Sequence, residues 1–210
     1  MLTVKAFAVN HVQENTFIVH NQKNAILIDP GMYFKNEYEE LENYLNANDL
    51  TVKIIACTHC HFDHVFALKW ASEKFNVIPK FHKDDLPLLQ IADIAAKKWN
   101  IDFSEKYLGD FEAIDEQSHL QLDDEVFTIL HIPGHSPGSV GFYNEKNKFI
   151  INGDVLFKNG YGRTDLPFCN EADLFASIKN KLFALPNETV VYTGHGESTT
   201  IGQEKSRYNL

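Results

Sequence analysis

Apolar residues along the chain fall into short runs rich in β-branched and aromatic side chains, the pattern typical of buried strands. In the first half of the chain the predicted strands are residues 2–9, 16–20, 25–28, 52–57 and 77–81. In the second half they are residues 126–132, 140–143, 149–151 and 190–192. Turn-forming residues close several runs, as Asp29-Pro30-Gly31 does after residues 25–28.

Apolar positions three, four and seven residues apart predict helices between these strands. We expect Asn36 to cap a first helix, residues 64–75 and 83–100 to be helical, and Asn170 to cap a fourth helix. The apolar faces assigned to the first, third and fourth helices are Tyr38, Leu41 and Leu45; Leu86, Leu89, Ile91, Ile94 and Trp99; and Leu174, Ile178 and Leu182. Residues 101–117 are expected to be mixed loop.

Strands precede helices in both halves of the chain, around a midpoint near residues 105–115. No low-complexity linker or residue-level repeat interrupts the pattern. This order predicts an α+β fold of two sheets with helices outside. We expect a single domain over residues 1–210, made of two packed αβ halves.

The length and composition fit this expectation. The chain has 210 residues, of which 44% are hydrophobic, enough to exclude global disorder. Lys and Arg number 19 against 29 Asp and Glu, and the net charge of -10 disfavours nucleic acids and anionic membranes as partners. No run resembles a secretory signal or a membrane span, and three cysteines do not suggest a disulfide framework. We therefore expect a cytoplasmic protein, whose oligomeric state the sequence leaves open.

Candidate chemistry concentrates in Thr58-His59-Cys60-His61-Phe62-Asp63-His64, directly after the predicted strand 52–57. Alternation at a strand end places His59 and His61 on one side, and a turn can bring Asp63 and His64 round beside them. Imidazoles and a carboxylate are suitable ligands for Zn, Mn or Fe. Three His and one Asp within six residues therefore predict a metal site rather than a surface histidine cluster.

Further ligands are expected at other strand ends, because one short loop rarely completes a metal site. Each of three candidates follows a predicted strand and neighbours a glycine, which permits close backbone approach. They are His135 in Pro133-Gly134-His135, Asp154 in Asn152-Gly153-Asp154 and His195 in Gly194-His195-Gly196. Each is weak alone, but the three together strengthen the prediction.

The full set His59-x-His61-x-Asp63-His64, His135, Asp154 and His195 resembles the metallo-β-lactamase superfamily over nearly the whole chain. The resemblance implies an αββα four-layer sandwich of two mixed β-sheets flanked by helices. It also implies a binuclear centre, foremost of zinc, with iron or manganese as alternatives. Carried over by position, one metal is held by His59, His61 and His135, and the other by Asp63, His64 and His195, with Asp154 bridging.

Within the superfamily, Gly162-Arg163-Thr164-Asp165 and Gly194-His195-Gly196 look most like the short glyoxalase II-like branch, the hydroxyacylglutathione hydrolases. The resemblance implies a thioesterase that cleaves S-acylglutathione-like thioesters with a metal-bridging hydroxide, and a small-molecule thioester as the partner. Asp63 is the candidate catalytic residue, orienting the nucleophile or handling its proton, or acting as a ligand only. Arg163 is a candidate for binding a substrate carboxylate, against the alternative of a structural pair with Asp165.

Two departures leave the substrate open. The chain ends fifteen residues after His195, without the helical domain of full-length glyoxalase II enzymes, and it has Glu197 near the position of their substrate-contacting tyrosine. The main alternative is a persulfide dioxygenase with one iron on His59, His135 and Asp154. A lactonase is a weaker option, and a non-catalytic metal-stabilised scaffold is disfavoured because structural sites normally close at four ligands. The carboxylate at Asp154 and the absence of a signal peptide count against a periplasmic β-lactamase.

The remaining chemistry-bearing residues receive ordinary roles. Asp29 is expected to orient the ligand loop through hydrogen bonds. Cys57 is expected to be a small buried residue and Cys60 to be partly exposed. The other histidines lack a motif and are expected to be ordinary surface or core residues: His11, His20, His82, His119 and His131.

Overall fold

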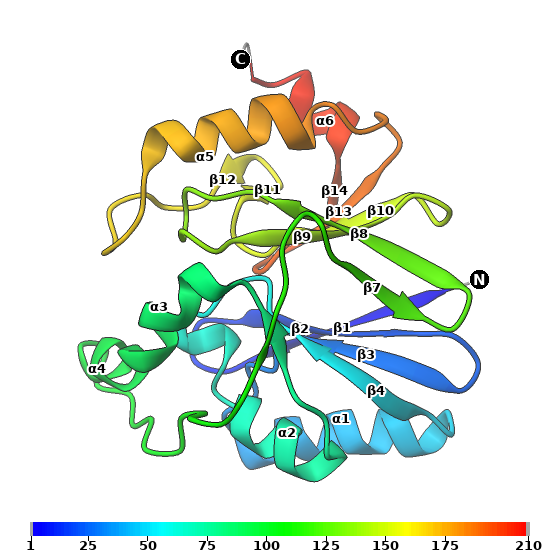
Figure 1. Ribbon diagram of the computed structural model, residues 1–210, viewed down its shortest axis with the longest axis vertical. Helices are drawn as coiled ribbons and strands as arrows, with labels where there is room; N and C mark the ends of the chain where they lie inside the picture. Colours follow the sequence, from blue (N-terminus) through cyan, green and yellow to red (C-terminus); the bar gives the residue numbers. More distant parts are fainter. Residues whose placement is uncertain (1, 209–210) are drawn as a thin grey trace. The chain divides into compact units, whose positions relative to one another are not determined.

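A computed structural model describes residues 2–208 of the chain. The chain forms two compact units. The first runs to Phe81 and resumes over Leu86–Ala113, whereas the second contains His82–Asp85 and continues from Ile114. Each unit contains one six-stranded sheet (Figure 1).

The sheet of the first unit has the strand order β1-β2-β3-β4-β5-β6. Its strands are β1 (Thr3–Val9), β2 (Glu14–His20), β3 (Asn24–Ile28), β4 (Thr51–Ala56), β5 (Lys80–Phe81) and β6 (Glu112–Ala113). β1, β2 and β3 pair antiparallel, and β3 to β6 pair parallel. Ile28 lies opposite Ala56, so the residues that follow β3 and β4 emerge together at one edge of the sheet.

Helices α1 (Lys35–Ala47) and α2 (Leu68–Phe75) lie on one face of this sheet (Figure 1). Leu41 and Leu45 of α1 are buried in a core that also contains Leu27 and Val52, as the helical spacing predicts. The predicted cap at Asn36 is wrong, because the helix begins at Lys35 and Phe34 is the cap. The Glu37 carboxylate accepts the N–H groups of Tyr33 at 2.7 Å and Phe34 at 3.0 Å instead.

Two predicted helices are shorter than expected. The helix predicted over residues 64–75 begins only at Leu68, as α2. The ligand residues before it form a 3₁₀ turn, η1 (Phe62–His64), instead. Residues 83–100 form η2 (Lys83–Asp85), α3 (Leu86–Gln90) and α4 (Ala92–Lys97) rather than one helix. Their predicted apolar face is only partly buried: Leu89 is in the core, whereas Ile94 and Trp99 are 58% and 54% exposed.

The sheet of the second unit has the order β14-β13-β10-β9-β8-β7. Its strands are β7 (His119–Leu122), β8 (Glu125–His131), β9 (Val140–Asn144), β10 (Phe149–Ile151), β13 (Val190–Tyr192) and β14 (Thr199–Thr200). β7 and β14 were not predicted because each is short and at least half of its residues are polar. β10 and β13 are parallel and end in register, Ile151 opposite Tyr192.

The helices of this unit pack on its sheet through an apolar core. α5 (Glu171–Ser177) begins at Asn170, whose side chain accepts the N–H groups of Ala172 and Asp173, so the predicted cap is confirmed. α5 continues into a π-helical turn, η3 (Ile178–Leu182), and the predicted apolar face is buried against Ile150 and Val191. The hairpin β11 (Leu156–Phe157) and β12 (Gly160–Tyr161) and helix α6 (Ile201–Lys205) complete the unit.

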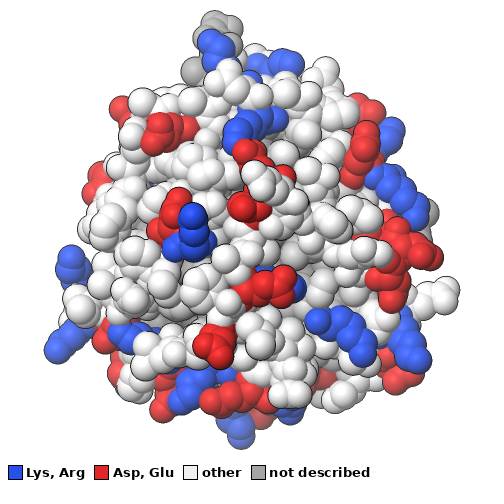
Figure 2. All heavy atoms as spheres, viewed as in Figure 1, with Lys and Arg blue, Asp and Glu red and all other residues white. Residues whose placement is uncertain are grey.

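The surface carries charges of both signs. Acidic and basic side chains are interspersed on the face drawn in Figure 2, with no continuous basic patch on that face. No helix within residues 2–208 has the length and apolar character needed to cross a membrane.

Candidate metal centre

In the first unit the predicted ligands lie together in the turn between β4 and α2. The imidazole of His59 lies 4.9 Å from that of His61 and 4.0 Å from that of His64, centroid to centroid. His59, Asp63 and His64 are buried, and His61 is half-buried. The turn begins where β4 ends, so the strand places four candidate metal ligands, three His and one Asp, at one point of the sheet edge.

Asp29, at the end of the neighbouring parallel strand, orients this turn as expected. Its carboxylate accepts the backbone N–H and the hydroxyl of Thr58, both at 2.6 Å, and the Nδ1–H of His64 at 3.0 Å. Because Nδ1 of His64 donates to Asp29, Nε2 is the nitrogen directed at Asp63, 3.8 Å from its Oδ2. The hydrogen bond thus selects the tautomer in which Nε2 of His64 has a lone pair for a metal.

Glu14 belongs to the same network, and it was not among the residues predicted from the sequence. Its side chain is fully buried, its Oε1 lies 3.6 Å from Nδ1 of His64, and it accepts the hydroxyl of Thr16 at 2.9 Å. Burial, partly opposed by the nearby His64, raises the pKa of Glu14 well above its ordinary value. A charged residue at the start of an otherwise buried strand is the signal that could have identified it.

Asn10 was also missed and holds the ligand turn from the other side. Its Nδ2 donates to the carbonyl oxygens of Gly31 and Asp63, at 2.9 Å each. Gly31 fits this approach because a Cβ there would lie 2.3 Å from the carbonyl oxygen of Asp63. The Asp29-Pro30-Gly31 turn therefore contacts the ligand turn through both backbone and side chain.

In the second unit Asp154 lies between two histidines. Its Oδ2 is 3.6 Å from Nε2 of His135 and 3.5 Å from Nε2 of His195. Nδ1 of His135 donates to the carbonyl oxygen of Arg163 at 2.9 Å, which leaves the lone pair on Nε2. One carboxylate oxygen faced by two imidazole nitrogens is the arrangement expected of a bridging ligand.

Strand pairing explains why these residues meet. After the parallel strands β10 and β13, Asn152 N–H bonds to Tyr192 and Gly194 N–H to Gly153, so the Asp154 and His195 loops run side by side. Gly153 has a φ of 53°, in the left-handed region that favours glycine.

Asp85 secures the His135 loop and was not identified from the sequence. Its two carboxylate oxygens accept the Ser136 hydroxyl at 2.9 Å and the Gly138 N–H at 2.6 Å. Asp85 is fully buried, so these bonds hold the segment directly after His135 in a region without competing water.

Arg163 is engaged by its neighbour. Nε and one terminal nitrogen of Arg163 donate to the two carboxylate oxygens of Asp165 at 2.7 and 2.8 Å. This is the structural pair that the sequence analysis gave as the alternative to substrate binding. Glu197, which stands near the position of the substrate-contacting tyrosine of glyoxalase II enzymes, forms an ion pair with Lys158.

The donor sets fit divalent metal ions. Two ligands on a tetrahedral centre with bonds of about 2.0–2.1 Å lie roughly 3.3 Å apart, close to the separations around Asp154 and between Asp63 and His64. In the first unit, the acidic side chains of Glu14, Asp29 and Asp63 each have an oxygen within 4 Å of the buried imidazole of His64. A cation supplies the positive charge that such a group of buried acids requires.

Two other features bear on the site. The expectation that Cys60 is partly exposed is wrong: it is fully buried in the core, as is Cys57.

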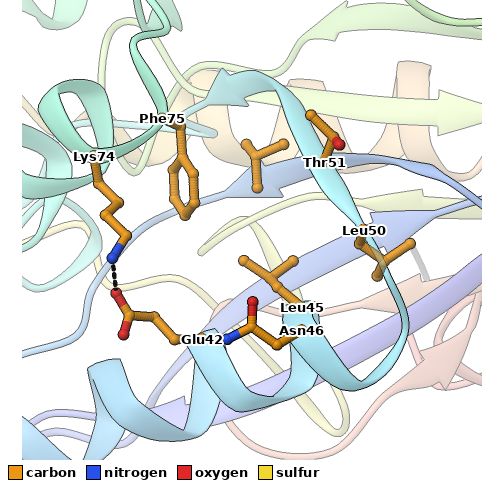
Figure 3. Close-up of a pocket in the computed structure, with 8 residues that line it drawn as sticks. Glu42, Leu45, Asn46, Leu50, Thr51, Lys74 and Phe75 are labelled. Carbon is orange, nitrogen blue, oxygen red and sulfur yellow. Dashed lines mark ion pairs between the residues drawn. The ribbon is translucent and has the colours of Figure 1, made fainter.

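A pocket of about 320 Å³ lies between α1, β4 and α2, lined by Leu45, Val52 and Phe75, with the Glu42–Lys74 ion pair at its edge (Figure 3). It contains none of the predicted ligands.

The chain matches the family described as "Metallo-beta-lactamase superfamily" over residues 9–195. Hydroxyacylglutathione hydrolase GloC of Haemophilus influenzae is 36% identical over 206 residues, covering 97% of this chain and 95% of that protein. A structure described as TTHA1623 in a di-iron-bound form matches with a TM-score of 0.84 and 36% identity over 96% of both chains. The BLEG-1 B3 metallo-beta-lactamase matches with a TM-score of 0.86 and 33% identity over 97% of both. These matches confirm the predicted fold class of two mixed sheets with flanking helices.

Proposed function

The chain belongs to the metallo-β-lactamase superfamily, and on that premise we propose that it is a glyoxalase II-type hydrolase that cleaves thioesters of glutathione or a similar small thiol. Membership of the superfamily and the His/Asp ligand groups make it a metallo-hydrolase. The thioester substrate is the proposed part, supported by 36% identity to GloC along nearly the full length of both proteins.

The observation that carries the proposal is the position of Asp154 Oδ2 between Nε2 of His135 and Nε2 of His195. A carboxylate so placed suits a two-metal centre. In the proposed centre His59, His61 and His135 would hold one metal and Asp63, His64 and His195 the other, with Asp154 as the ligand that would serve both. When bound, such metals supply a hydroxide nucleophile at neutral pH and polarise a carbonyl oxygen.

The protein groups then serve defined roles. Asp29 keeps Nδ1 of His64 protonated, and the Arg163 carbonyl does the same for His135, so that both Nε2 atoms remain ligands. Asp63 accepts the proton of the attacking water and returns it to the departing sulfur. The C–S bond breaks as the new C–O bond forms, and the products are a carboxylic acid and a thiol.

The experiment that tests the proposal joins metal analysis to substrate profiling. Protein purified without added metal is assayed for metal per chain and for hydrolysis of S-lactoylglutathione. We expect close to two metals, either zinc or iron, and thioester cleavage that Asp154→Ala abolishes. His119→Gln, which changes an exposed histidine outside the ligand set, serves as the matched control.

Other outcomes contradict the proposal in distinguishable ways. One iron with oxygen uptake on glutathione persulfide and no thioester cleavage would identify a persulfide dioxygenase. Hydrolysis of a chromogenic β-lactam without thioester cleavage would identify a β-lactamase, the activity for which BLEG-1 is named. Turnover of a lactone alone would identify a lactonase.

A further inference from the structure

A second group of metal-ligating side chains lies in the second unit, apart from the proposed ligands. His82 and Asp84 stand in the short segment around η2, and His131 is the last residue of β8. One ligand atom from each of the three lies within 4.8 Å of the others. No sequence motif connects His82 with His131, because 49 positions separate them along the chain.

Both imidazoles present the same nitrogen as an acceptor. Nε2 of His131 lies 2.9 Å from the carbonyl oxygen of Pro137, which can only accept, so Nε2 carries the proton and Nδ1 the lone pair. Nδ1 of His82 accepts the backbone N–H of Asp84 at a long 3.3 Å, so its lone pair is engaged in a weak hydrogen bond that an ion would replace. A carbonyl or other acceptor behind one ring nitrogen is the usual support of a metal-binding histidine.

The spacing and mobility of the three groups suit a small cation. The two rings stack with centroids 4.3 Å apart and an interplanar angle of 7°, and Oδ2 of Asp84 is 3.7 Å from Nδ1 of His82. Stacked, parallel rings direct their in-plane lone pairs alongside one another, so binding a shared ion requires one ring to turn out of the stack. The Asp84 side chain is 49% exposed and can follow that movement.

The local charges favour a cation over a protonated histidine. Burial, and then the neighbouring His131, lower the pKa of His82, which favours the neutral ring that binds metals. Asp84 and Asp115 act on His82 as negative charges and Lys83 as a positive one. Glu116 accepts the backbone N–H of His131 at 3.2 Å and pairs with Lys181.

We propose that His82, Asp84 and His131 form an additional binding site for a divalent transition metal such as Zn²⁺, with water completing the coordination. Such an ion ties the segment of residues 82–85 to the end of β8. Asp85 of that segment already anchors the loop of His135, so the ion stabilises the support of this ligand without touching it. This inference does not depend on which substrate the enzyme hydrolyses.

The test is zinc binding by the metallated enzyme. Equilibrium dialysis against Zn²⁺ is expected to add one equivalent per chain to the resident metals of the wild type. His131→Gln and Asp84→Asn are expected to lose that equivalent, or to bind it at least tenfold more weakly, while keeping resident metal and thioester hydrolysis. Asp84 is exposed, so its variant keeps the test valid if the change at half-buried His131 impairs folding.

The matched controls are His119→Gln and Asp124→Asn, which alter exposed residues of the same types in the same unit. Added zinc should also raise the melting temperature of the wild type and the controls but not of the site variants. The proposal is overturned if the wild type takes up no zinc beyond its resident metals, or if both site variants bind it like the controls. If the wild type does not hydrolyse thioesters, that result would contradict the proposed function but not the additional zinc site.

Discussion

The carboxylate of Asp29 accepts the Nδ1–H of His64 at 3.0 Å, and through this bond a residue after β3 sets the tautomer of a ligand after β4. The same carboxylate also accepts two hydrogen bonds from Thr58, directly before His59. One buried acid therefore positions both ends of the ligand turn.

Replacing this acid by its amide should weaken metal binding. Asp29→Asn keeps the shape but offers one acceptor oxygen where the carboxylate has two, and removes a charge. We expect metal affinity and kcat/KM to fall by about 10–100-fold, measured by chelator competition and thioester hydrolysis. Asp124→Asn, on the surface, should change neither, and equal effects of the two variants would contradict the assigned role.

The bridging position predicts the strongest loss at Asp154. Asp154→Ala leaves Nε2 of His135 and of His195 without the carboxylate that lies 3.6 and 3.5 Å from them. We expect metal content to fall and activity to drop by more than about 100-fold. Elemental analysis and steady-state kinetics provide the measurement. A fully active, metal-free Asp154→Ala protein would disprove the metal-dependent mechanism.

Gly162 is expected to tolerate no side chain. A Cβ there would lie 1.8 Å from the carbonyl oxygen of Asp154 and 3.1 Å from Nδ1 of His135. Gly162→Ala should therefore destabilise the fold by about 1–3 kcal/mol and reduce activity, as seen by chemical unfolding and kinetics. Gly160→Ala, whose Cβ would come no closer than 3.9 Å to Phe157, is the matched control and should be nearly neutral.

Removing Asp85 should loosen the loop of His135. Asp85→Ala leaves the Gly138 N–H and the Ser136 hydroxyl without the carboxylate that accepts both. A hydrogen bond to a charged group is worth about 1.5–3 kcal/mol, so we expect a loss of that order in the free energy of unfolding. A variant as stable as the wild type in urea would show that the loop does not depend on this residue.

The Arg163–Asp165 pair predicts a pH-dependent signal. Hydrogen bonding to Arg163 lowers the pKa of Asp165 to about 2. Since the folded-state pKa is depressed, the stabilising effect is present above the unfolded pKa of about 3.9 and is lost as pH falls toward 2. In Arg163→Gln, NMR titration of the Asp165 carboxyl should show its pKa rising toward about 3.9. An unchanged pKa would mean that the pair is absent in solution.

Residue type and local spacing determined much of the candidate site. The run from His59 to His64 and the three single ligands after strands are visible as motifs, because metal ligation limits the residue types that can serve. The apolar strands and the Asn170 cap were also predictable, since burial and capping depend on neighbours in sequence.

Contacts between distant residues could not be predicted from spacing alone. Glu14 and Asn10 reach the ligand turn only after β1 to β4 have paired. Asp85 reaches the loop of His135 across about fifty residues, and the tautomers of His64 and His135 depend on acceptors 35 and 28 positions away. The split of residues 83–100 is likewise a tertiary outcome, because helical spacing alone allowed one continuous helix.

The sequence by itself determined the His/Asp motif, most of the longer buried strands, and the superfamily to which the chain belongs. Only the tertiary structure decided that Glu14 and Asp85 also support the ligand residues, that Arg163 pairs with Asp165, and that His82 and His131 stack. The physical reason is that ligand chemistry and periodicity are local properties of the chain. Hydrogen-bond partners, burial and tautomers instead depend on strand pairing and loop packing, which bring together residues that are far apart in the sequence.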